Sequence, residues 1–141
     1  PQNLGAIIRS AEALGVHGII LPKNRTSTIN ETVAKCSSGA IEYLPISWVT
    51  NLTRGIEQLK EAGFWIAGIV PDGNTPCYQH KFDEPMVLVI GGEEKGIRPL
   101  LKKSCDVTLK IPMEGSLESL NASAAAAVIF YETLRQKNMR S

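Results

Sequence analysis

Three small polar residues stand near the end of the chain, directly before a run of four alanines. The stretch SLNASAAAA places Ser119, Asn121 and Ser123 close together, after a strand-like segment and a glycine-bearing loop. Such residues cap helices because a short side-chain oxygen accepts a hydrogen bond from the unpaired amides of the first turn. One cap needs one such residue, so the surplus has to be explained by another part of the chain.

Arg9 is a second candidate for chemistry, on a segment with helical spacing. It lies opposite the apolar stripe of the expected helix and four residues after Gly5. Because helical side chains tilt toward the N-terminus, its guanidinium would pass over the bare glycine toward Asn3 and free amides that favour anions. The alternative is an arginine on a solvent-exposed face, as most arginines are. The residues alone leave both interpretations open.

A glycine-bearing loop follows the most apolar run of the chain. In MVLVIGGEEKG, three glycines (Gly91, Gly92 and Gly96) allow backbone amides to approach a ligand closely, and Glu93 supplies a carboxylate. The alternative is a tight turn with a solvated acid. The loop sequence matches neither of the phosphate-binding motifs GxGxxG and GK[ST], so it gives little support to a site for a nucleotide phosphate.

The segments around these residues alternate between strand-like and helix-like patterns. We expect helices over 3–15, 32–37 and 50–63, a short helix within 93–104 and an Ala-rich C-terminal helix, with strands over 17–22, 40–46, 64–71, 86–92 and 106–112. Asn3 and either Thr50 or Asn51 are the expected caps. The alternation predicts an α/β fold with a mostly parallel sheet flanked by helices. Ligands of such sheets collect at the carboxyl ends of strands, where the loops IVPDGN, IGGEEKG and IPMEGSLESLN fall.

The composition is that of an ordinary globular domain. With 141 residues, of which 43% are hydrophobic and 21% charged, the chain fits one domain and not a disordered or coiled-coil class. The net charge of +1 does not by itself indicate a polyanionic partner. No apolar run could span a bilayer and no leader pattern is visible, so we expect a cytoplasmic protein. Cys36, Cys77 and Cys105 are widely spaced without a CxxC pair, which argues against structural zinc or a disulfide framework.

Three stretches together resemble the motifs of a known enzyme family. NLGAIIRSAEALG, LVIGGEEKGIRPL and IPMEGSLESLNASAAAAVIFYE are similar, in order and spacing, to the three motifs of the SpoU (TrmH-like) branch of the SPOUT methyltransferases. The resemblance covers essentially the whole chain. It implies an S-adenosylmethionine-dependent RNA 2′-O-ribose methyltransferase with a C-terminal trefoil knot, acting as a homodimer without a metal on tRNA or rRNA, with rRNA slightly favoured.

The resemblance also assigns roles to individual residues. Arg9 matches the arginine thought to activate the ribose hydroxyl, and we expect it to orient the acceptor and stabilise developing negative charge, since a guanidinium stays protonated in water. Asn3, Glu93, Ser119 and Asn121 match the other polar positions of the active site. The cofactor is expected to contact Val70, Pro71, Ile90, Gly91, Gly92, Glu93, Gly96, Ile111, Pro112, Met113, Ser119, Leu120 and Asn121.

The start of the chain departs from the family pattern. In the family, a strand that ends in an acidic residue and a proline precedes the first motif, whereas this sequence begins at the proline, Pro1. These residues also leave no room for the small N-terminal RNA-binding domain that many relatives carry. We therefore expect residues 1–141 to be the methyltransferase domain of a longer protein. One alternative is a non-catalytic RNA-binding or assembly module with the same fold, against which the joint presence of the polar positions argues. Another is a nicotinamide-dependent oxidoreductase, which lacks its fingerprint glycines here.

Overall fold

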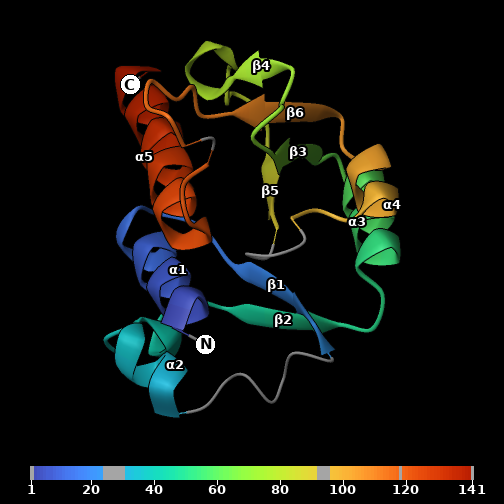
Figure 1. The fold of residues 1–141 in the computed structure, drawn as a ribbon. Coiled ribbons are helices and arrows are strands. Elements are labelled where there is room, and N and C mark those ends of the chain that lie inside the picture. Colours follow the sequence, from blue (N-terminus) through green and yellow to red (C-terminus); the bar gives the residue numbers. More distant parts are fainter. Residues whose placement is uncertain (1, 24–30, 92–95, 118, 141) are drawn as a thin grey trace.

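Helices and parallel strands alternate along the chain, as the apolar periodicity predicts. The computed structural model describes residues 2–23, 31–91, 96–117 and 119–140 (Figure 1). Its α-helices, 3-10 helices (η) and strands are α1 (Gln2–Ala13), β1 (Ile19–Pro22), α2 (Glu31–Cys36), η2 (Ala40–Glu42), β2 (Ile46–Val49), α3 (Leu52–Glu61), β3 (Trp65–Ile69), β4 (Thr75–Pro76), η3 (Cys77–Gln79), β5 (Met86–Ile90), α4 (Pro99–Lys103), β6 (Val107–Lys110) and α5 (Ala122–Arg140). None of the helices in this part of the chain has the length and apolar character to cross a membrane.

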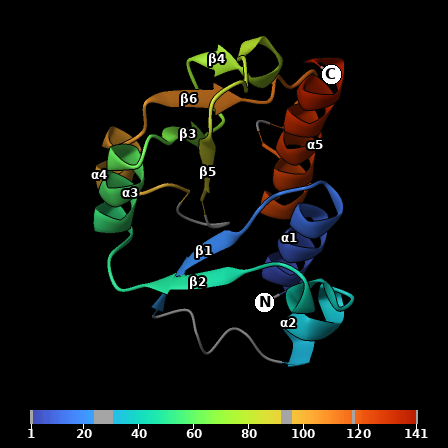
Figure 2. The same ribbon diagram turned by 180° about the vertical axis from the view of Figure 1, so that it is seen from behind.

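The described strands pair in parallel and form two sheets. β1 pairs with β2, and the larger sheet has the order β4-β6-β3-β5. In its middle, Gly68 of β3 stands opposite Val89 of β5 and Thr108 of β6. Helices α1, α2 and α5 lie on one side of the strands and α3 and α4 on the other, as the front and back views show (Figures 1 and 2). The predicted α/β class with parallel pairing is confirmed.

Helix α5 holds the core together because it contributes to two hydrophobic clusters. The first cluster consists of Ile8, Ala11, Val33, Ala40, Leu44, Ala126 and Phe130. The second consists of Ala67, Cys77, Phe82, Leu109 and Ile129. The alanines at the start of α5 keep this helix slim, so that α1 can pack along it.

The strand expected over 40–46 is wrong in its position. Residues Ala40–Glu42 form a 3-10 turn, and the strand is β2, which begins at Ile46. Gly39 has φ of 84°, a left-handed conformation that turns the chain before the expected strand. Leu44 is buried in the first cluster while Tyr43 is exposed. The apolar residues of this stretch before β2 therefore pack in the core and do not pair with a neighbouring strand. The loop expected over 72–85 likewise contains β4 and η3.

The helix ends agree with the expected caps in one case and differ in another. α1 begins at Gln2, so Asn3 lies inside the first turn and the expected cap is wrong. Asn51 caps α3 as predicted, because its side-chain oxygen accepts from the amide of Arg54 at 3.1 Å. Gly15, with φ of 83°, follows the end of α1 as expected.

We expect Gly73→Ala to destabilise the fold. A Cβ at Gly73 would lie 2.7 Å from the carbonyl oxygen of Leu109, and the backbone of β6 cannot move aside without disturbing the sheet. Overpacking of this kind costs about 1–3 kcal/mol in the free energy of unfolding. Urea unfolding measures the loss, with Gly115→Ala as the matched control because a Cβ there meets no atom within 4 Å. Equal stability of the two variants would contradict the close approach of Gly73 to β6.

Candidate functional site

The turn after β3 is fastened to the end of β6. The amide of Val70 donates to the carbonyl of Leu109 at 2.9 Å, and the amide of Gly73 closes the turn on Val70 at 3.2 Å. Pro71 stands at the second position of this turn, where its fixed φ is favoured. Pro71 and Asp72 are both exposed, so the turn presents them at the carboxyl edge of the sheet.

Gly91 follows β5 and requires the absence of a side chain. A Cβ at this position would collide with the backbone of Gly96, so the chain passes close to itself here. Ile90 and Gly91 are both half-buried. Gly92 and Glu93, which were predicted to contact a ligand, lie outside the described residues. The described residues on the two sides of this loop, Gly91 and Gly96, therefore approach each other closely, as the glycines predict.

The segment after β6 exposes its backbone. Ile111 packs against the second core cluster, and the chain is exposed from Pro112 onward. Residues 113–117 make no backbone hydrogen bond with any other described residue. Met113 is 36% exposed and Leu117 81% exposed. Exposed backbone donors and acceptors beside exposed apolar side chains suit a ligand that has both polar and apolar parts.

Asn121 caps α5, which accounts for part of the surplus of polar residues before this helix. Its side-chain oxygen accepts from the amide of Ala124 at 2.8 Å and from the hydroxyl of Ser123 at 3.1 Å. Ser119 and Leu120 are exposed and take no part in this cap. The side-chain oxygen of Asn121 is thus engaged within the helix start, while Ser119 stays available to a ligand.

Asn3 and Arg9 lie on different faces of α1. Ile8 and Ala11 are fully buried and Arg9 is exposed, which confirms that Arg9 lies opposite the apolar stripe. The side-chain nitrogen of Asn3 is buried and has no hydrogen-bond partner among the described residues. A buried donor of this kind is costly unless it is paired, so it marks a place where a ligand or a further part of the protein can accept.

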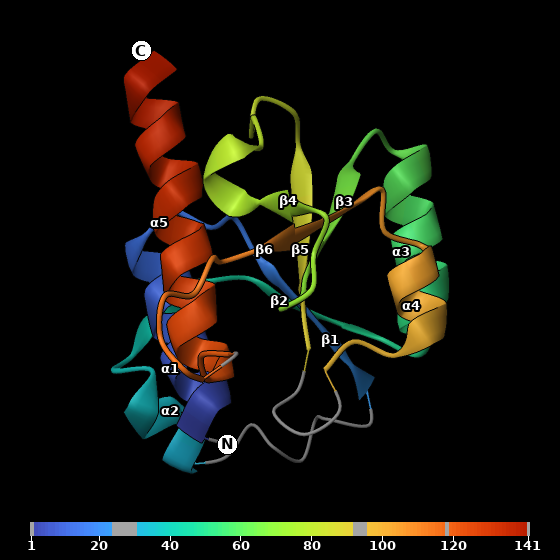
Figure 3. The ribbon, with the colours of Figure 1, turned by 45° about the horizontal axis from the view of Figure 1, so that its top comes forward.

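The structure brings most of the predicted site residues to one side of the molecule. The carboxyl end of β5 and the N-terminal ends of α1 and α5 lie on the same side in two different views (Figures 1 and 3). Since α1 packs along α5, Asn3 and Arg9 belong to the same helical layer as the start of α5.

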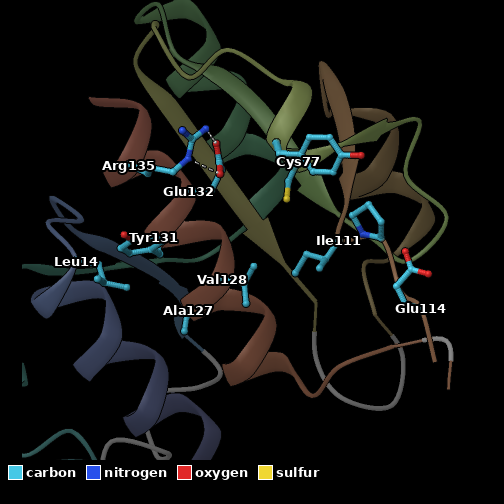
Figure 4. Close-up of a pocket in the computed structure, with 11 residues that line it drawn as sticks. Leu14, Cys77, Ile111, Glu114, Ala127, Val128, Tyr131, Glu132 and Arg135 are labelled. Carbon is cyan, nitrogen blue, oxygen red and sulfur yellow. Dashed lines mark hydrogen bonds and ion pairs between the residues drawn. The ribbon is translucent and has the colours of Figure 1, made fainter. Parts of the chain in front are cut away.

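A groove of about 780 Å³ lies between α5, η3 and the segment after β6 (Figure 4). Val128 on α5 faces Ile111 across this groove. It is lined by Leu14, Cys77, Tyr78, Ile111, Pro112, Glu114, Ala127, Val128, Tyr131, Glu132 and Arg135. Of these, the sequence analysis predicted only Ile111 and Pro112 as site residues. Tyr78 gave no signal in the sequence because it lies in a stretch of turn-forming residues.

The polar end of the groove is an ion pair on α5. Arg135 donates to both carboxylate oxygens of Glu132, at 2.8 and 3.1 Å. These hydrogen bonds lower the pKa of Glu132. Burial, and next the negative charge of Glu132, raise the pKa of the Cys77 thiol. Cys77 therefore stays protonated and acts as a core residue rather than a nucleophile, and the described residues contain no His, Cys, Asp and Glu cluster suited to a metal ion.

Comparisons with known proteins agree on one class of enzyme. The SpoU rRNA methylase family matches residues 1–131. A Staphylococcus haemolyticus protein assigned by its name to the TrmH family of tRNA/rRNA methyltransferases is 46% identical over 138 residues, which cover 98% of this chain and 55% of that protein. A Synechocystis tRNA/rRNA methyltransferase is 50% identical over 137 residues, which cover 97% of this chain and 36% of the relative. The chain thus spans about half, or less, of the length of these relatives.

Solved structures with the same fold include enzymes of this class. The SpoU methyltransferase AviRb from Streptomyces viridochromogenes, in complex with its cofactor AdoMet, superposes with a TM-score of 0.89 at 35% identity. The match covers 99% of this chain and 57% of AviRb. A structure named RNA 2′-O ribose methyltransferase superposes with a TM-score of 0.87 at 26% identity and covers 98% of this chain and 53% of that one.

Proposed function

The chain belongs to the SpoU rRNA methylase family, within the TrmH-like branch of the SPOUT methyltransferases, and on that premise we propose that it methylates a ribose 2′-hydroxyl of RNA. The methyl donor is S-adenosylmethionine, as in the AviRb complex. The substrate is tRNA or rRNA, the two classes in the relatives' names, with rRNA slightly favoured and the cytoplasm as the place of action. The observation that carries the proposal is the combination of the exposed loop 113–117, whose backbone groups have no backbone partner among the described residues, with the chain segments at Pro71 and Gly91.

The three loops fit the two parts of the proposed cofactor. Gly91 lets the end of β5 pass close to the backbone of Gly96, and Pro71, Met113 and Leu120 supply exposed apolar contacts. Backbone groups of 113–117 can meet the polar edge of an adenine and the amino-acid part. When bound, the cofactor supplies an electrophilic methyl group on a sulfonium. Our proposal includes the trefoil knot, formed by the loops after β5 and β6.

Arg9 and the other polar positions of the motifs are proposed to act on the ribose. A 2′-hydroxyl is a weak nucleophile at neutral pH, so it needs positioning and stabilisation of the negative charge that develops on its oxygen. Arg9 supplies a planar cation for this purpose, together with Asn3, Glu93 and Ser119. Asn121 contributes through its side-chain nitrogen, because its oxygen already accepts two hydrogen bonds in the helix cap.

We test the proposed activity by transfer of labelled methyl groups from S-adenosylmethionine to ribosomal and transfer RNA lacking the modification. Alkaline hydrolysis then distinguishes the product, because cleavage of the RNA backbone needs a free 2′-hydroxyl and stops at a methylated ribose. Labelled, alkali-resistant dinucleotides are the expected result. Label that leaves the RNA with the bases would overturn the ribose specificity, and binding of cofactor without turnover on any RNA would favour the non-catalytic module.

We further propose that two copies of the chain form a symmetric dimer through α1 and α5. Val128 is 42% exposed and Tyr131 57% exposed on α5, and Leu14, directly after α1, lines the same groove, so that the three form an apolar surface there. A two-fold axis buries such a surface against its own copy.

Replacing Val128 by glutamate should weaken this dimer by about tenfold, because each copy places a charge in the apolar contact. Light scattering over a dilution series measures the shift, with Lys137→Glu on the exposed part of α5 as the control. A wild-type chain that is monomeric at micromolar concentration would refute the dimer.

A further inference from the structure

Gln136 makes a set of hydrogen bonds that joins two distant parts of the chain. Its side-chain oxygen accepts from the amide of Phe82 at 2.9 Å, and its nitrogen donates to the carbonyl of His80 at 2.8 Å. The amide side chain thereby pairs with one stretch of backbone in the way a neighbouring strand does. The second hydrogen of the same nitrogen goes to Glu132 at 2.7 Å. Both amide hydrogens are used, so the orientation of Gln136 is fixed.

The ion pair at the groove fixes the partner of Gln136. Glu132 receives Arg135 on both carboxylate oxygens, and Gln136 on one of them. Arg135 therefore holds Glu132, Glu132 orients Gln136, and Gln136 holds the backbone between His80 and Phe82. The hydrogen bonds in this series that involve a charged group are stronger than hydrogen bonds between neutral groups.

The segment that Gln136 holds is connected to the proposed ligand loop. Within it, Cys77 and Phe82 are buried in the same cluster as Leu109 of β6. Just before it, Pro76 of β4 pairs with Lys110, the last residue of β6. The free backbone of 113–117 begins three residues later, and the intervening residues 111 and 112 line the groove together with residues 77 and 78.

We propose that Gln136 is a positioning residue for methyl transfer: by holding segment 77–82 against α5, it fixes the end of β6 and the loop 111–117 that follows. The proposal rests on the proposed function for the identity of the ligand. Gln136 itself lies on the far half of α5 from the helix start and is not part of the site that contacts the cofactor.

The first test is hydrogen exchange of the whole chain with Gln136→Met, which keeps the length of the side chain and removes its hydrogen bonds. The matched control is Lys137→Met, at the exposed neighbouring position. We expect backbone amides to exchange faster both in 77–82 and in 107–111, the paired end of β6, with S-adenosylmethionine affinity reduced about tenfold, the scale of one or two lost hydrogen bonds. Faster exchange confined to 77–82, or unchanged affinity, would overturn the positioning role.

The second test is a pH-dependent rescue with Gln136→Glu. At pH 8 the new carboxylate faces Glu132 and cannot donate, so affinity should fall about tenfold. Toward pH 5 one of the two neighbouring carboxylates takes up a proton, because like charges at this distance resist joint ionisation, and the restored donor should return affinity to within about threefold of wild type. The titratable groups facing this position are Glu132 and Arg135 on α5 and Cys77 and His80 on the held segment.

Wild type measured at the same pH values removes the contribution of those groups. A defect of Gln136→Glu that does not change with pH would mean that the donated hydrogen bond is not what matters, and would overturn the inference. A wild-type chain that binds no S-adenosylmethionine would refute the proposed function instead. In that case the exchange rates of 107–111 still decide whether Gln136 fixes the end of β6 from which the loop starts.

Discussion

Replacing Arg9 by alanine is expected to lower methyl transfer to RNA by about two orders of magnitude or more, the scale of losing one positioned charge-stabilising group. Arg9 is exposed on α1 and packs into neither core cluster, so the fold and the cofactor affinity should remain those of wild type. Single-turnover transfer of labelled methyl with saturating cofactor isolates this effect, because it reports the chemical step without product release.

Two further variants sharpen the Arg9 experiment. Arg9→Lys should not restore activity, because an ammonium lacks the planar fork that holds a hydroxyl and a phosphate together. Arg54→Ala is the matched control, since Arg54 is an exposed arginine on α3, on the other side of the strands. If Arg9→Ala and Arg9→Lys both transfer methyl at wild-type rates, Arg9 is a solvated surface residue and has no part in the mechanism.

Replacing Gly91 by alanine should lower the affinity for S-adenosylmethionine by about a hundredfold or more, since small backbone displacements near a site cause losses of this order. The new Cβ would collide with the backbone of Gly96, so the turn after β5 has to open. Opening moves the backbone that we propose as part of the cofactor site. Isothermal calorimetry measures the affinity, and circular dichroism checks that the chain still folds.

Gly55→Ala serves as the control for Gly91. Gly55 lies in α3, where a Cβ would make ordinary contacts of 3.7 Å with Val49. This substitution should leave cofactor affinity unchanged and stabilise the helix by up to about 1 kcal/mol. Unchanged affinity in a folded Gly91→Ala variant would place the cofactor away from the turn after β5.

The strands and helices with strong local signals were predictable from the sequence. The run MVLVI forms β5, which pairs in parallel with β3, although it lies at an edge of the larger described sheet and not in the middle that its apolar composition suggests. Asn51, one of the two expected caps, caps α3. Gly91 stands where a side chain would collide, which is the close backbone approach that a glycine after a strand indicates. The cap and the close approach at Gly91 depend on interactions within a few residues of one another, and β5 is marked by the apolar, β-branched composition of its own residues.

Features set by distant contacts were not predictable. The stretch around Leu44 has a strand-like composition, yet packing against α1 and α5 makes its first residues a 3-10 turn. Gln136 bonds to residues more than fifty positions away, and neither its type nor its spacing distinguishes it from a solvated glutamine. The cofactor loops were predicted from motif resemblance, whereas the groove beside them depends on the path of η3.

The double role of α5 has a consequence for biosynthesis. Both core clusters need side chains near position 130, so the residues that precede α5 leave the ribosome before the helix that completes either cluster. Until that helix emerges, Ile8, Leu109 and their neighbours expose apolar surface and strand edges to other nascent chains. Pairing of the parallel strands also joins residues that are distant in the sequence, and such contacts form slowly during folding. The window between synthesis of β6 and of α5 is therefore the stage at which this chain depends most on chaperones.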